Sequence, residues 1–248
     1  MTSFRPRKTA LQIAADFAKA GPLKLLYIGC GLYAMFTMAD IAMTAMNEGL
    51  SIDSAINGIL AAALILLTVR LCQLSGDMSK ESAARAARAS IIVFAVILLT
   101  VFMLALLYYT TWSVINGLDA DAMTEYGLAA EDVTRFNDTA FPAIANMAFS
   151  LIQGLAFMFF FRALNDIRTM AGAMKPDRNA CRTASIFAAV TAGFSIAAVL
   201  FDLSSETGFV STMMNILYDI PCIMIFSAMA FLCKQTADDV SALKGAAK

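Results

Sequence analysis

Six long apolar runs, separated by shorter polar stretches, dominate the chain. A helix needs about 20 mostly apolar residues to cross a hydrocarbon core of about 30 Å. The run at 90–109, SIIVFAVILLTVFMLALLYY, is the strongest, and the period-two alternation of a transmembrane β-strand is absent from the sequence. The pattern therefore predicts an all-α, polytopic integral membrane protein, a single domain over 1–248 with six transmembrane helices at roughly 23–46, 54–74, 90–114, 142–162, 184–202 and 208–233.

The composition supports this class. Hydrophobic residues make up 60% of the chain and charged residues 15%, with a mean hydropathy of +0.72. Ordinary soluble domains are about 45–50% apolar and about 25% charged. The net charge of −1 gives no basis for a nucleic-acid partner. We therefore expect the lipid bilayer to be the main environment of the chain.

Nearly all the basic residues lie in segments on one side of the predicted membrane. If both termini lie on the same side, that side carries every one of the 18 Lys and Arg residues except Arg135. Cytoplasmic loops near membrane ends are enriched in Lys and Arg, so this distribution predicts an N-in, C-in protein of the cell membrane. The segment 115–141 then becomes an acidic extracytoplasmic loop, in which we expect a short amphipathic helix from Leu128 to Phe136.

The two ends of the chain are predicted to be cytoplasmic. Residues 1–22 form an amphipathic N-terminal segment, and residues 234–248 form a tail. Within the first, 9–20 is expected to be a short helix that Pro22 separates from the first transmembrane helix, because proline breaks a helix. Its apolar residues would lie on the inner membrane surface: Leu11, Ile13, Ala14 and Phe17.

The two longest inner connections resemble each other. Arg70 and Arg162 each precede a polar, helix-like segment that leads to an Ala-Ser-Ile opening the next apolar run. This predicts an internal repeat of helical hairpins related by an axis along the membrane normal. The alternative is that amphipathic cytoplasmic loops converge on similar compositions. The same connections, near Arg85 and Arg178, are the expected docking surfaces for a cytoplasmic partner protein, and the Gly/Ala-rich helices favour a homo-oligomer.

A polar stripe follows one face of every predicted helix, because residues three, four and seven apart share a face. Most of the stripe residues fall in the outer half of the membrane, whereas the inner half is almost purely apolar. Stripes that face one another would line a polar cavity that is open to the outside of the membrane and closed toward the inside. The stripes are Tyr33, Thr37, Asp40 and Thr44; Asp53 and Asn57; Thr100, Tyr108 and Thr111; Asn146, Ser150 and Gln153; Thr191, Ser195 and Asp202; and Asn215, Asp219 and Cys222.

Asp219 is the most informative stripe residue, since a carboxylate deep in a bilayer is costly and is usually retained for a function. Pro221 follows two residues later and leaves the carbonyl of Leu217 without its helical partner, which is a feature of the broken helices of transporters. No Lys or Arg lies deep in any predicted helix, so the cavity suits a cation, a proton or a neutral polar solute. Aromatic lining from Tyr33, Tyr108, Tyr109, Trp112 and Tyr218 would add cation–π attraction.

These observations predict a protein that handles a small cationic or neutral polar solute, as a transporter or as the substrate-capturing subunit of one. The predicted binding residues are Asp219, Asp40, Asn215, Asn146, Gln153, Asp202, Tyr108 and Tyr33. The alternative is a non-transporting sensor, immunity or assembly subunit whose polar stripes serve only as helix-packing contacts, since such residues commonly hydrogen-bond between transmembrane helices.

Signatures of other chemistries are missing from the sequence. It contains no histidine, no CxxC among its five cysteines, no Walker loop and no GxSxG or GxGxxG motif. We therefore expect no metal, no cofactor and no enzymatic activity, although an intramembrane enzyme that pairs Asp40 with Asp219 stays open as an alternative. The triplet Gly29-Cys30-Gly31 is too short for a phosphate loop and predicts a point of close helix packing.

Overall fold

The computed structural model describes residues 8–47, 49, 51–117, 130–138, 140–204 and 209–245. These residues form helices joined by short connections, and no strand occurs among them. The helices are α1 (Ala10–Lys19), α2 (Gly21–Asn47), α3 (Ile52–Gly76), α4 (Lys80–Gly117), α6 (Ala130–Asp138), α7 (Ala140–Ala171), α8 (Ala180–Ser204) and α9 (Phe209–Gly245).

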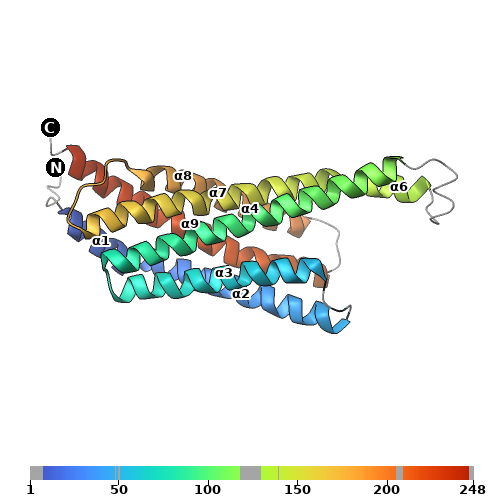
Figure 1. Cartoon of the computed structure of the whole chain (residues 1–248), viewed down its shortest axis with the longest axis horizontal. Coiled ribbons are helices and arrows are strands. Elements are labelled where there is room, and N and C mark those ends of the chain that lie inside the picture. Colours follow the sequence, from blue (N-terminus) through green and yellow to red (C-terminus); the bar gives the residue numbers. More distant parts are fainter. Residues whose placement is uncertain are drawn as a thin grey trace.

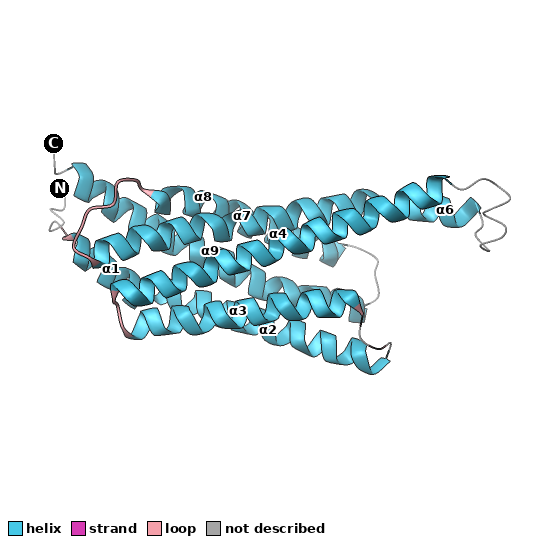
Figure 2. Cartoon of the chain, in the orientation of Figure 1, coloured by secondary structure: helices cyan, strands magenta, loops and turns pink. Residues whose placement is uncertain are grey.

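Six of these helices are long and apolar enough to cross a membrane: α2, α3, α4, α7, α8 and α9. The predicted all-α fold with six transmembrane helices is therefore confirmed. The helices run farther than the apolar runs, because the polar stretches after Arg70, Arg162 and Lys234 continue as helix. Only the loops at 77–79 and 172–179 remain at that end of the molecule, where Figure 2 shows them in pink. The internal repeat and the N-in, C-in orientation stay predictions.

The six long helices form a closed ring. Contacts join α2 to α3, α3 to α4, α4 to α7, α7 to α8, α8 to α9 and α9 back to α2. Figure 1 shows α4 and α7 running side by side to one end, where α6 lies. The short helix α6 overlaps the helix predicted from Leu128 to Phe136, and residues 118–129 lie outside the described part of the chain.

Helix packing is tightest in the half of the ring near α1. A Cβ added at Gly29 in α2 would lie 3.0 Å from Cγ1 of Ile225 in α9, which confirms the predicted close packing there. Large apolar side chains fill this half and are almost fully inaccessible to solvent: Leu23, Leu26, Leu67, Leu71, Leu74, Phe160, Leu164, Ile167, Met170, Met229 and Leu232.

The short helix α1 closes this end of the ring. Thr9 caps it, with the Thr9 hydroxyl accepting from the Gln12 backbone and the Gln12 side chain accepting from the Thr9 backbone. Its apolar face packs against α7, α9, α3 and α2, and Ile13, Ala14 and Phe17 are buried there. The sequence predicted that this face would lie on the membrane surface. The structure instead buries it within the protein and leaves only Leu11 of the predicted set exposed.

Candidate functional site

A chamber of about 210 Å³ lies in the centre of the ring. Five of the six long helices contribute polar side chains to its wall, and apolar side chains complete it. Its deepest residues on α7 and α9 are Phe157 and Phe226, whose rings make an edge-to-face contact at 5.6 Å and form the floor. The polar lining consists of Tyr33 from α2, Asn57 from α3, Thr100 from α4, Ser150 and Gln153 from α7, and Cys222 from α9.

A second, outer chamber of about 390 Å³ adjoins the first, because Leu104 and Ser150 line both. It lies between α4, α7 and α6, and Asn146 is exposed at its wall. The ring of Tyr108 stacks on Phe136 of α6 with centroids 5.3 Å apart. The Tyr108 hydroxyl is buried and has no hydrogen-bond partner within the described part of the chain. A donor and acceptor of this kind is available to a guest in the chamber.

The polar groups of the inner chamber are mostly not used to join helices. Among the described residues, no hydrogen bond ties the Asn57 or Gln153 side chain to another residue, and the Thr100 hydroxyl donates to the carbonyl of Val96 in its own helix. Interhelical bonds use side chains outside the chamber lining, as where the Ser90 hydroxyl donates to the Phe157 backbone carbonyl at 2.8 Å. Unpaired amides in a membrane interior are costly unless water or a ligand satisfies them.

An acidic and aromatic cluster adjoins the chamber between α2 and α9. The Tyr218 hydroxyl donates to the carbonyl of Phe36 at 3.3 Å, and the Tyr218 side chain lies within electrostatic reach of Asp40. Asp219, on the same helix, lies within electrostatic reach of both Tyr33 and Cys222. Since Tyr33 and Cys222 also line the inner chamber, the Asp219 carboxyl group lies close to its wall, while Asp40 is linked to the cluster through Tyr218.

The electrostatic character of the two chambers follows from what surrounds them. Neither has a Lys or Arg side chain in its described lining, while Asp219 lies beside the inner one and Asp40 lies near Tyr218 in the adjoining cluster. In a low-dielectric environment such an arrangement favours positive charge and disfavours anions. Within the described residues, no group of three or more Cys, Asp or Glu side chains is arranged to hold a metal ion.

The structure brings together most of the predicted site residues. Tyr33 and Gln153 line the inner chamber, Tyr108 and Asn146 line the outer one, and Asp40 and Asp219 form the adjoining cluster. The side chains of Asp202 and Asn215 lie outside the described part of the molecule. Asn57, Thr100, Ser150 and Cys222 were missing from the predicted binding set, although their places on the polar stripes marked them.

Other expectations about the lining do not hold. Tyr109 and Trp112 are exposed on the outside of α4 and do not line either chamber. The described part of the α8 stripe is also separate, because Thr191 and Ser195 line neither chamber; both are buried and donate to carbonyls of their own helix. Pro221 lies within a continuous α9, so it removes one backbone hydrogen bond without unwinding the helix.

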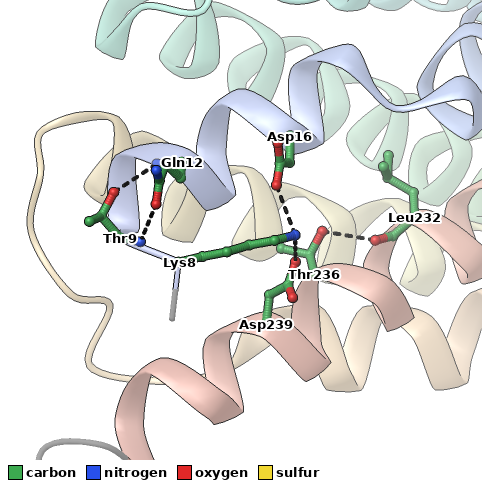
Figure 3. A network of polar contacts seen from close by, with 7 residues as sticks. All are labelled: Lys8, Thr9, Gln12, Asp16, Leu232, Thr236 and Asp239. Atoms are coloured by element: carbon green, nitrogen blue, oxygen red, sulfur yellow. Dashed lines mark hydrogen bonds and ion pairs between the residues drawn. The ribbon is translucent and has the colours of Figure 1, made fainter. Parts of the chain in front are cut away.

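At the end of the ring opposite the chambers, an ion-pair latch links the start of α1 to α9 (Figure 3). The Lys8 ammonium lies 2.8 Å from a carboxylate oxygen of Asp16 in α1 and 2.8 Å from one of Asp239 in α9. Hydrogen bonds to Asp16 and Asp239 raise the pKa of Lys8 above its ordinary value. Together with the buried Phe17, this latch fixes α1 beneath the apolar core.

The arrangement is thus a polar, acid-flanked pair of chambers toward one membrane face, with an apolar floor, a packed core and a latched helix toward the other. No protein family, curated protein or solved structure matches the chain, so this geometry and the sequence carry the functional argument.

Proposed function

We propose that this protein binds a small cationic or neutral polar solute in the inner chamber and transports it, or captures it for an energising partner. The observation that carries the proposal is the inner chamber itself. Polar groups from five helices converge there, and the Asn57 and Gln153 amides have no partner among the described residues. Groups that served only to pack helices would be paired across them, as Ser90 is with Phe157.

The chemistry of the wall supports a cation or a neutral polar solute over an anion. Asn57, Gln153, Thr100 and Ser150 offer neutral oxygen ligands and amide donors, and the Asp40 and Asp219 cluster supplies negative charge beside them. The volume of about 210 Å³ corresponds to about seven water molecules at roughly 30 Å³ each, which restricts the guest to a small solute.

The route that we propose runs from the outer chamber past Leu104 and Ser150 into the inner one. Onward passage requires the Phe157 and Phe226 pair and the packed core to part, which is how alternating access separates the two sides. In this scheme the described conformation is the outward-facing one, with the face that carries α1 in the cytoplasm as the positive-inside rule predicts.

A melting experiment on purified protein tests the proposal. Wild type, Asp219→Asn and Gln153→Leu are melted with a panel of monovalent, divalent and small organic cations, neutral polar solutes and buffers of different pH. A ligand at 100 times its dissociation constant stabilises the folded state by about 2.7 kcal/mol. At about 2–4 °C per kcal/mol for a chain of this size, the melting temperature should rise by about 5–11 °C.

The matched control is Ser90→Ala, which removes an interhelical hydrogen bond by changing a side chain that lines neither chamber. We expect it to lower the melting temperature and to keep the ligand shift, whereas the two site variants lose the shift without being less stable. Uptake of the stabilising solute into proteoliposomes then separates transport from capture. The proposal is wrong if no solute raises the melting temperature of the wild type and both site variants melt at markedly lower temperatures. The polar groups would then be packing contacts, and the sensor or assembly role would replace the proposal.

A further inference from the structure

A groove of about 800 Å³ runs along the outside of the ring between α8 and α9. Its wall is built from small side chains, including Ala189, Gly193 and Ala230, and a Cβ added at Gly193 would meet no atom within 4 Å. The exposed side chains of Ile186 and Phe231 flank it. The groove is therefore open, unfilled and apolar over most of its length.

Charged side chains are confined to one end of this groove. Arg182 from α8 and Lys234 from α9 line that end, which is the end of the ring where α1 lies. Both side chains are exposed, and neither forms an ion pair with another described residue. Asp238 lines the same end and leaves a net charge of +1 there.

The length of the groove matches one membrane leaflet. From Arg182 to Ile196 it follows 14 residue steps of α8, which at about 1.5 Å per residue span about 21 Å. Half of a hydrocarbon core of about 30 Å is about 15 Å, so the apolar part accommodates an acyl chain while the basic pair reaches headgroup depth. The basic end of the groove therefore fits the headgroup of a phospholipid, and the apolar part fits an acyl chain.

We propose that the α8–α9 groove binds one anionic phospholipid from the leaflet on the α1 side of the membrane. Arg182 and Lys234 pair with its phosphate, and an acyl chain lies along Ala189, Gly193 and Ala230. The Asp238 carboxylate accepts a hydrogen bond from a hydroxyl group of the headgroup, as in phosphatidylglycerol. This site is separate from the inner chamber, and the inference does not depend on the proposed transport function.

Titration with phosphatidylglycerol, followed by native mass spectrometry of the intact protein, tests the proposal. Basic residues near an anionic lipid surface each add to the affinity for that lipid. Removing both Arg182 and Lys234 should therefore weaken lipid binding about 30-fold, which is about 2 kcal/mol at about 1.4 kcal/mol per tenfold. We expect wild type to retain one phosphatidylglycerol in preference to phosphatidylcholine, and Arg182→Gln/Lys234→Gln to lose that preference. Gly193→Leu should weaken binding with both charges intact, because it fills the open wall.

The matched control is Arg88→Gln/Arg168→Gln, which removes two exposed basic residues from the same end of α4 and α7, outside the groove. It should bind within about threefold of wild type. The proposal is overturned if this control loses as much affinity as the groove variant, or if inorganic phosphate competes as well as the lipid. A dimer that Gly193→Leu dissociates regardless of lipid would assign the groove to a second copy of the chain instead.

Discussion

The contact of α2 with α9 at Gly29 gives the sharpest test of the packing. Replacing Gly29 with alanine places a methyl group 3.0 Å from Cγ1 of Ile225, and also 3.3 Å from the Ile225 backbone nitrogen and 3.3 Å from Cβ of Met224. A side-chain tip can rotate away, but the backbone of α9 can retreat only as a unit. Gly31, two residues along the same helix, offers a matched site, since its added Cβ would lie at an ordinary 3.6 Å from Cγ2 of Thr68.

The two substitutions share the same gain in helix propensity, so the difference between them isolates the steric effect. Overpacking of a close contact costs about 1–3 kcal/mol, while the glycine-to-alanine change in a helix interior contributes up to about 1 kcal/mol of stability at either site. Gly29→Ala should therefore melt about 2–12 °C below Gly31→Ala, at about 2–4 °C per kcal/mol.

The thiols of the chain provide the assay. Cys30, Cys181, Cys222 and Cys233 are buried and Cys72 is exposed, so a thiol-reactive dye on a Cys72→Ser background reports unfolding. Because the same interface positions Asp40 and Asp219, Gly29→Ala should also weaken the ligand shift more than Gly31→Ala does. Equal melting temperatures for the two variants, or a higher one for Gly29→Ala, would refute the close approach.

Three further outcomes are expected. Lys8→Met should increase protease cleavage near α1. Because the pKa of Lys8 is raised in the folded protein, the latch contributes its full stabilisation below the ordinary lysine pKa of about 10.5 and loses it as the pH rises above that value. Melting temperatures of the wild type and Lys8→Met, measured from about pH 8 to about pH 11.5, should therefore converge at high pH. Phe226→Ala should lower stability by about 3–5 kcal/mol and make the floor of the inner chamber leaky to small solutes in liposome flux assays, whereas equal leakage from wild type would contradict its role as a floor. In sealed, oriented vesicles a membrane-impermeant maleimide should label the exposed Cys72 from the cytoplasmic side only, and labelling from the other side would reverse the proposed orientation.

The apolar runs were sufficient to predict six transmembrane helices, because length and hydropathy alone determine whether a helix can cross a bilayer. They could not predict where those helices end. The segments after Arg70 and Lys234 are polar but remain helical, since the end of hydrocarbon does not terminate a helix. The helices end instead at the loops 77–79 and 172–179. The apolar stripe of α1 was also visible in the sequence, but a stripe does not distinguish a lipid surface from a protein core.

The site was predictable to the extent that helix periodicity places residues on one face. It grouped Asn146, Ser150 and Gln153 on a face that does line the chambers. Periodicity does not give the rotation of a helix relative to its neighbours, and for that reason the α8 stripe, with Thr191 and Ser195, was wrongly expected to join them. The prediction that Tyr109 and Trp112 line the cavity was wrong for the same reason, since their positions along α4 indicate their depth in the membrane but not which side of the helix they face.

The latch between Lys8 and Asp239 also constrains how the protein is made. The two residues are 231 positions apart, so at about 5–20 residues per second the ribosome synthesises Lys8 roughly 12–46 seconds before its partner. For most of that interval α7 is still incomplete, and α9 is not complete until its end, so Ile13 and Phe17 lack part of their protein cover throughout. The nearest apolar medium for a nascent amphipathic helix is the surface of the bilayer. We therefore expect α1 to rest on the membrane surface while the chain is being synthesised, and to dock beneath the core late in assembly.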